Sequence, residues 1–262
     1  MSICEPNDDI SWINSARGVS QFLLTTDRDI LITIVGELHE QDFDCEMNGV
    51  SLSMFEYCNT RVDANPLCEV FLEYPPEFKD HDRIGSKIIR DVFTSGPNKV
   101  QEVTSGIDIR RDFIGGENHE ILYHRENQIP NSLEEIKKKY IDPFSVKNLE
   151  EKCGKPEPQL SKHYTDMLNT KFSNISRVYQ ADKNEGIMSL KWAWAMVTDY
   201  YILNRILSDK DTKEYIVIIG KNHLINLTET LNNMDGCKSI TKITNNNETN
   251  CVAGHKMKRI CI

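Results

Sequence analysis

The chain lacks any apolar run long enough to cross a lipid bilayer, which takes about 20 consecutive apolar residues. Its acidic, polar beginning, residues 1–9, holds no apolar core of the kind that directs secretion. The sequence therefore predicts a cytoplasmic protein with no membrane partner.

Positive charge is also scarce. The chain has 31 Lys and Arg against 40 Asp and Glu, a formal net charge of −9. Nucleic-acid binding relies on a concentrated basic surface that neutralises phosphates. The densest basic cluster, Lys137–Lys139, is short and follows two glutamates, a pattern typical of a solvated helix face. The charge balance therefore predicts no nucleic-acid partner.

Several signatures of known chemistry are absent. The eight cysteines include no Cys-x-x-Cys pair, and with no secretion signal they are expected to be free thiols. No Walker or dinucleotide-binding glycine pattern occurs. There is also no Gly-x-Ser-x-Gly elbow to present a serine nucleophile, and no His-Glu-x-x-His motif of a zinc peptidase. The sequence therefore excludes zinc-peptidase chemistry of the His-Glu-x-x-His type and does not support a serine nucleophile or a nucleotide-binding loop.

What the chain does have is an alternation of apolar runs and amphipathic stretches. Runs rich in β-branched and other apolar residues predict strands at 29–35, 68–74, 103–109 and 215–219. Apolar residues at helical spacing predict helices at 11–24, 49–59, 82–93, 186–207 and 224–231. Weak alternation after residue 236 predicts edge strands. This order predicts an α/β fold, a three-layer α/β/α sandwich around a mostly parallel sheet that is mixed at its edges.

Domain organisation follows from length and from one polar stretch. A chain of 262 residues is near the upper limit of a single hydrophobic core. We therefore expect one α/β domain over 1–262, with a polar insertion at about 117–155. His119, Tyr123 and His124 fall in this insertion and are expected at the surface.

Two of the strong strands run into the same motif, Gly-x-x-His. The first is Gly36–His39 and the second is Gly220–His223. Glycine lets the chain turn sharply at a strand end, and open α/β sheets bind ligands at that edge. Chance alone gives about 0.35 matches (13 glycines × 7/262), and the chain has three. The third, Gly116–His119, follows no strong strand and is set aside.

Acidic side chains complete the candidate site. Glu73 closes the second strand and is expected at the same edge as the two histidines. Asp108 would reach that edge from the third strand, but a structural ion pair between Asp108 and Arg110 is an equal interpretation.

The motifs GELHE, FLEYP, GIDIR and IIGKNHLINL, in this order between about Ile30 and Leu231, resemble the superfamily of erythromycin esterase, the ChaN proteins and the TraB–Tiki proteins. The resemblance implies their three-layer fold, with His39, Glu73 and His223 in one cleft and Glu37 beside them. It also implies known activities of the superfamily: lactone hydrolysis, metal-dependent peptide cleavage or haem binding.

The long helix departs from the pattern of that superfamily. It offers Asp199, but it lacks the arginine that often adjoins the acid in the esterase and ChaN branches. The implied substrate therefore does not transfer.

Two mechanisms fit these residues. Without a metal, one histidine is a general base toward water while Glu73 orients it. With a metal, His39, Glu73 and His223 would be a two-histidine, one-carboxylate site for Mn, Co or Zn. The favoured function is a hydrolase of ester, lactone or amide bonds in a small-molecule or peptide substrate. The alternative is a non-catalytic protein of the same fold that binds haem or a partner.

Overall fold

A computed structural model describes residues 2–4, 12–14, 16–25, 28–37, 51–76, 86–155, 157–244, 251–252 and 259–261. The chain divides into two compact units. The first comprises Met1–Gly106 and Lys210–Ile262, and the second comprises Ile107–Asp209. The polar insertion expected at 117–155 belongs to the second unit, and the assignment of the whole chain to one domain stays a prediction.

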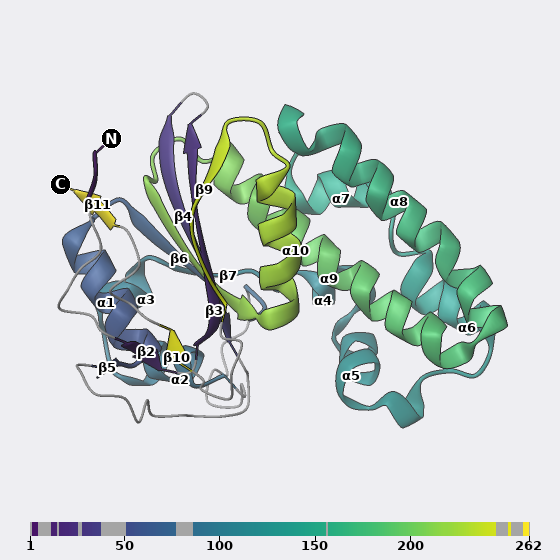
Figure 1. Cartoon of the computed structure of the whole chain (residues 1–262). Coiled ribbons are helices and arrows are strands. Elements are labelled where there is room, and N and C mark those ends of the chain that lie inside the picture. The colour runs from purple at the N-terminus through teal and green to yellow at the C-terminus, as the bar shows by residue number, and fades with distance from the viewer. Residues whose placement is uncertain are drawn as a thin grey trace. The chain divides into compact units, whose positions relative to one another are not determined.

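A six-stranded mixed sheet lies at the centre of the first unit (Figure 1). The four strands β7, β6, β8 and β4 are mutually parallel, whereas β3 is antiparallel to both of its neighbours, β4 and β9. In sheet order the strands are β7 (Thr104–Gly106), β6 (Cys68–Leu72), β8 (Glu214–Gly220), β4 (Asp29–Glu37), β3 (Ala16–Thr25) and β9 (Cys237–Thr244). The predicted α/β class is confirmed.

The apolar runs of the sequence account for the central strands. All side chains from Ile30 to Val35 in β4 are buried, as expected for a strand covered on both faces. The strands predicted at 29–35 and 215–219 are confirmed, and the strand predicted at 68–74 is present but ends at Leu72. The strand predicted at 103–109 is shorter, because it ends at Gly106 and the chain enters helix α4 (Arg110–Ile114).

The segment 11–24, which helical spacing predicted to be a helix, forms strands instead, so that prediction is wrong. It contains β2 (Trp12–Asn14) and most of β3. The stretch from Gly18 to Phe22 is buried on both faces, so its apolar residues do not alternate with polar ones. Pairing with β4 and β9 satisfies the backbone of β3, and this tertiary context overrides the local spacing.

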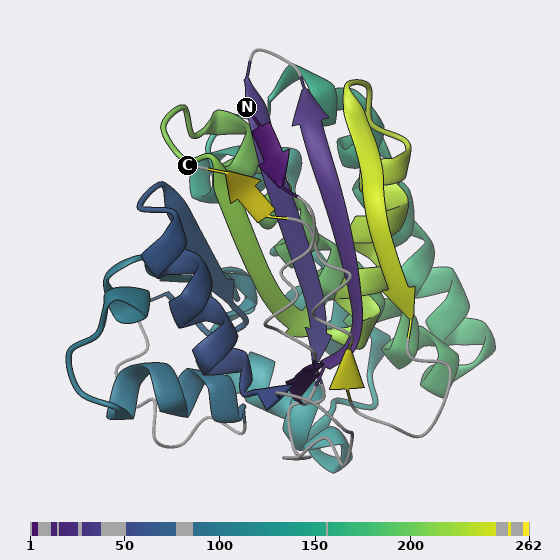
Figure 2. The ribbon, with the colours of Figure 1, turned by 60° about the vertical axis from the view of Figure 1, so that its left-hand side comes forward.

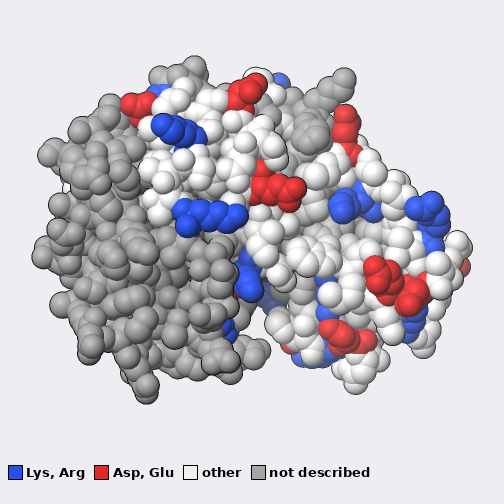
Figure 3. Space-filling view, viewed as in Figure 1, with Lys and Arg blue, Asp and Glu red and all other residues white. Residues whose placement is uncertain are grey.

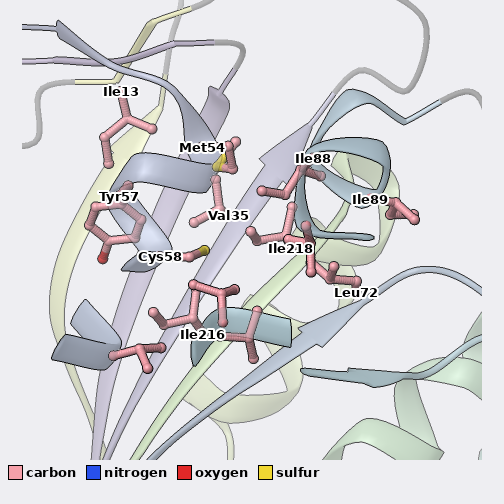
Figure 4. Close-up of a cluster of buried hydrophobic side chains, with 14 of the residues drawn as sticks. Ile13, Val35, Met54, Tyr57, Cys58, Leu72, Ile88, Ile89, Ile216 and Ile218 are labelled. Carbon is pink, nitrogen blue, oxygen red and sulfur yellow. The ribbon is translucent and has the colours of Figure 1, made fainter. Parts of the chain in front are cut away.

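Helices cover both faces of this sheet (Figures 1 and 2). On one face lie α1 (Met54–Ala64), α2 (Lys87–Thr94) and α3 (Lys99–Glu102), and on the other lies α10 (Lys221–Asn232). Figure 4 shows the apolar cluster between α1, α2 and the sheet, which includes Val35, Met54, Cys58, Ile88 and Ile218. Burial of this cluster supplies the main driving force for packing this layer.

Helix α1 begins later than the predicted range 49–59, and the sequence shows why. The backbone N–H of Glu56 donates to Ser53 Oγ at 3.2 Å, and the Glu56 carboxylate accepts from the backbone N–H of Ser53 at 2.7 Å. This capping box fixes the first turn at Met54. Of the helix predicted at 82–93, residues 82–85 lie outside the described residues, Ser86 is the N-cap of α2, and residues 87–93 lie within α2.

The second unit is helical. Its two long helices are α8 (Pro158–Ala181) and α9 (Lys183–Ser208), which pack closely at Gly186, where an added Cβ atom would clash with the backbone of Tyr179. α9 confirms the helix predicted at 186–207. Shorter helical elements precede them: α4, α5 (Gly116–His124), η2 (Glu126–Gln128), α6 (Leu133–Ile136), the π-helix η3 (Lys137–Ile141) and α7 (Val146–Cys153).

Helix α8 was missed at the sequence level, although its signal is present. Buried apolar residues recur every three or four positions, at Leu160, Tyr164, Leu168, Phe172, Ile175 and Tyr179.

In the described part of the chain, no helix is long and apolar enough to span a membrane.

Short strands form two further small sheets in the first unit. One pairs β1 (Ser2–Cys4) with β11 (Arg259–Cys261), and the other joins β2 to β5 (Ser51–Leu52) and β10 (Cys251–Val252). The edge strands expected after residue 236 are therefore present as β9, β10 and β11.

A buried ion pair fixes α1 to the start of β8. Arg61 Nε donates to Glu214 Oε1 at 2.8 Å, and Asn65 Nδ2 donates to Glu214 Oε2 at 3.1 Å. The Glu214 side chain is fully buried, so its charge depends on these donors rather than on water.

We predict that Arg61→Ala lowers the free energy of unfolding by about 3–5 kcal/mol, because it strands a buried carboxylate. Urea denaturation measures the change. Lys99→Ala is the control, since Lys99 pairs with Asp63 at the surface at 2.6 Å, where water screens the interaction. A loss for Arg61→Ala no larger than the control would show that the pair does not hold α1 in place.

Candidate functional site

Residues of the predicted site follow three parallel strands of the first unit. Glu37 ends β4, Glu73 directly follows β6, and His223 lies in the first turn of α10 after β8. In the sheet, Glu37 pairs with Gly220 and Leu72 with Ile218, so the three strands end level with one another. The predicted parallel arrangement with a shared edge is confirmed for these strands. His39 lies outside the described residues.

Glu73 and His223 meet at this edge. His223 Nε2 lies 3.3 Å from Glu73 Oε1, and the exposed fractions of the two side chains are 6% and 8%. The backbone N–H of Gly220 donates to the other carboxylate oxygen, Glu73 Oε2, at 2.9 Å. Together these contacts fix the carboxylate between the end of β8 and the first turn of α10.

The local chain explains this geometry. α10 starts immediately after β8, and Gly220, its N-terminal cap, has no side chain to accept a hydrogen bond from the first turn. The positive end of the helix favours a negative charge nearby, and Glu73 supplies it from the neighbouring strand. At the level of Gly36, a Cβ atom would lie only 2.8 Å from Leu224 Cδ2, so glycine allows α10 to pack against β4.

The side chain of Glu37 projects from the face of the sheet opposite to α10. Gly36 faces Leu224 of α10, and successive residues of a strand point to alternate faces. Accordingly, Glu37 accepts from the hydroxyl of Ser86, with Ser86 Oγ 3.0 Å from Oε1 and 3.3 Å from Oε2. Ser86 precedes α2, on the face covered by α1 and α2. Glu37 therefore belongs to a polar contact separate from the Glu73–His223 pair.

Asp108 and Arg110 belong to the second unit, where they form a buried bidentate pair. Arg110 Nε lies 2.7 Å from Asp108 Oδ1 and Arg110 Nη2 lies 2.9 Å from Oδ2. His119 Nε2 approaches Oδ2 at 3.4 Å. Burial opposes ionisation of Asp108, but Arg110 and His119 outweigh it and hold the pKa of the carboxyl well below its usual range.

The expectation that His119 lies at the surface is wrong. Only 7% of the residue is exposed, and its ring packs on Tyr123 with centroids 4.8 Å apart. Tyr123 is half-buried, and its hydroxyl donates to the carbonyl of Lys191 at 3.1 Å. His124 is exposed, as expected. His119 packs on Tyr123 and lies 3.4 Å from Asp108, and the polarity of the local sequence does not reveal contacts of that kind.

Asp199 also belongs to the second unit. It is fully buried in α9. Burial and the nearby carboxylate of Asp199 raise the pKa of Tyr164 well above its ordinary value. Asp199 is thus part of the buried polar structure of the helical unit.

Two partners in these contacts were missed by sequence reasoning. The Gly220 backbone N–H could have been anticipated, because a helix that starts directly at a strand end presents free amide groups. Ser86 precedes an apolar helical stretch, a signal for a helix cap, but its hydroxyl contacts Glu37 instead of capping α2. Only the packing of α2 on the sheet reveals that contact.

The described residues alone do not form a metal site. Within the described ranges, no group of three or more His, Cys, Asp or Glu side chains could hold a metal ion. Glu73 and His223 supply two of the three predicted ligands. The thiols of Cys58, Cys68, Cys153 and Cys237 are free and are not part of the site.

Acidic and basic side chains are interspersed over the described surface in the view of Figure 3.

Comparisons with other proteins give no assignment: no protein-family model, curated protein or solved structure matches the chain. The contacts of its own residues therefore carry the functional interpretation.

The lowered pKa of Asp108 gives a pH prediction for the helical unit. A carboxylate with a depressed pKa contributes stability above its unfolded value, about 3.9, and the contribution is lost as the pH falls through the folded value. We expect acidification from about pH 5 to pH 2 to destabilise the wild type more than Asp108→Asn, which cannot titrate. Thermal unfolding midpoints across this range measure the difference.

Asp166→Asn, at an exposed position of α8, is the matched control and should keep the wild-type pH dependence. Identical acid sensitivity in the wild type and Asp108→Asn would contradict the prediction.

Proposed function

We propose that the chain is a hydrolase of ester, lactone or amide bonds and that Glu73 and His223 are its reactive pair. The observation that carries this proposal is the 3.3 Å approach of His223 Nε2 to Glu73 Oε1 at the carboxyl edge of the parallel strands. Open α/β sheets bind ligands at this edge, and a carboxylate beside an imidazole is a common arrangement for proton transfer.

The contacts define a role for each group. With Nε2 directed at the carboxylate of Glu73, this nitrogen carries the proton and Nδ1 becomes the basic atom. Nδ1 would take a proton from water as the oxygen attacks the substrate carbonyl, and would return it to the departing alcohol or amine. Glu73 would stabilise the imidazolium that forms between these steps. The Gly220 N–H keeps Glu73 in position throughout.

The proposal includes the three-layer fold of the erythromycin esterase, ChaN and TraB–Tiki superfamily. Helices on both faces of the mixed sheet support it. His39, the histidine of the first Gly-x-x-His motif, would then join Glu73 and His223. With Mn, Co or Zn bound, these three side chains would be the ligands and the metal would activate water. The roles given to Glu73 and His223 above do not depend on a metal.

Glu73→Gln tests the pair with the least disturbance, because the amide oxygen can still accept from Gly220 while the charge is removed. We expect kcat/KM to fall by about 10²–10⁴-fold, the usual contribution of a general base and its partner. His223→Ala should abolish turnover similarly and cost about 1–3 kcal/mol of stability, because a buried partner is lost. Turnover is measured on a panel of esters, lactones and peptides.

His124→Ala, at an exposed position of the other unit, is the control and should retain full activity. A wild-type protein that is inert across the panel would contradict the proposed function, as would a Glu73→Gln variant with unchanged rate.

Metal titration separates the two chemical routes. If metal is required, EDTA should abolish activity, and excess Mn²⁺, Co²⁺ or Zn²⁺ should partly restore Glu73→Gln, since a lost ligand lowers metal affinity. If metal is not required, EDTA should have no effect on the wild type and Glu73→Gln should stay slow at every metal concentration.

A further inference from the structure

Arg17 lies at the same edge of the sheet as Glu73 and His223. β3 is antiparallel to β4, so the start of β3 lies beside the end of β4. Ala16 pairs with Glu37 and Gly18 with Gly36, which leaves Arg17 as the extra residue of a β-bulge. Bulges next to functional sites often serve to redirect one side chain. Neither the resemblance nor the two Gly-x-x-His motifs singled out this residue.

One nitrogen of the Arg17 guanidinium, Nε, lacks a hydrogen-bond partner in the described structure. The residue is partly buried, and its Nε atom is buried with no hydrogen-bond partner among the described residues. The carboxylate across the strand, Glu37, accepts from the hydroxyl of Ser86. Removing such a donor from water without a partner is costly. An anion that accepts from Arg17 would recover this cost.

We propose that Arg17 binds a carboxylate of the substrate, so that the enzyme acts on acidic esters, lactones or amides. This inference rests on the proposed function of Glu73 and His223. The planar guanidinium fork matches a carboxylate with two parallel hydrogen bonds. In the order β8, β4, β3, the strand that bears Arg17 is two strands from the one that leads to His223. Strands are about 4.8 Å apart, which places the two strands roughly 10 Å apart.

A matched ester series tests this specificity. The substrates are mono-4-nitrophenyl esters of dicarboxylic acids from succinate to suberate, each compared with its methyl-capped neutral diester. We expect Arg17→Ala to lower kcat/KM for the acidic esters at least about tenfold, through KM, since a charged hydrogen-bonding partner is lost. The neutral diesters should change by less than about threefold, and Arg17→Lys should restore part of the loss.

Arg177→Ala, at an exposed position of α8, is the charge-matched control and should leave both series unchanged. An equal loss on acidic and neutral esters, or no loss on either, would overturn the role given to Arg17.

A binding measurement separates this inference from the hydrolase proposal. The free dicarboxylates are titrated into the wild type, Arg17→Ala and Arg17→Lys by calorimetry, with inorganic phosphate as a second anion. We expect the wild type to bind the dicarboxylates and Arg17→Ala to bind them at least tenfold more weakly, a loss of one charged contact. If this holds while no ester is hydrolysed, the hydrolase proposal fails and the anion site stands. Binding that is equal in the wild type and Arg17→Ala, or stronger for phosphate than for any dicarboxylate, overturns the carboxylate assignment.

Discussion

The hydrogen bond from the Gly220 backbone to Glu73 is the contact on which the geometry of the candidate site depends. It joins the end of one parallel strand to the residue that follows its neighbour, at the point where α10 begins. A helix start presents amide groups that need acceptors, and Glu73 provides one. With one carboxylate oxygen held in this way, the other lies beside the imidazole Nε2 of His223 in the first turn of the helix.

The polarity of the surroundings of β8 changes along the strand. Its middle, from Tyr215 to Ile219, is fully buried and apolar, so it can only be a central strand. Charged groups lie at its two ends: the Arg61–Glu214 pair at its start, and the Glu73–His223 pair beyond its end. In the first pair, the carboxylate of Glu214 accepts hydrogen bonds from both Arg61 and Asn65. The second lies at the edge where parallel sheets leave room for ligands.

Buried polar contacts in this protein hold elements in place more often than they mark reactive sites. Arg110 donates two hydrogen bonds to the Asp108 carboxylate, and His119 lies near one of its oxygens. Asp108 and Arg110 thus form a structural ion pair of the helical unit. The contact between Ser86 and Glu37 likewise attaches α2 to the end of β4. The buried Nε of Arg17 has no hydrogen-bond partner among the described residues, and the same holds for both ring nitrogens of His119.

Much of the sheet was predictable, since long β-branched runs can be buried only as central strands, and the strands at 29–35, 68–74 and 215–219 follow from that constraint. The shared edge of Glu73 and His223 was predictable for the same reason, because parallel strands end at one side. The segment 11–24 was mispredicted because a strand buried on both faces carries no alternation, so only its pairing with β4 and β9 identifies it.

The sequence by itself therefore determined the α/β class and the edge of the sheet at which the candidate site lies. Tertiary structure alone decided which groups meet there. Glu37 ends β4 and Glu73 directly follows the parallel strand β6, yet Glu37 contacts Ser86 whereas Glu73 contacts His223. Pairing between β3 and β4 likewise makes Arg17 the extra residue of a β-bulge at this edge. Such contacts depend on register and packing between segments far apart in the chain, and local residue patterns do not encode them.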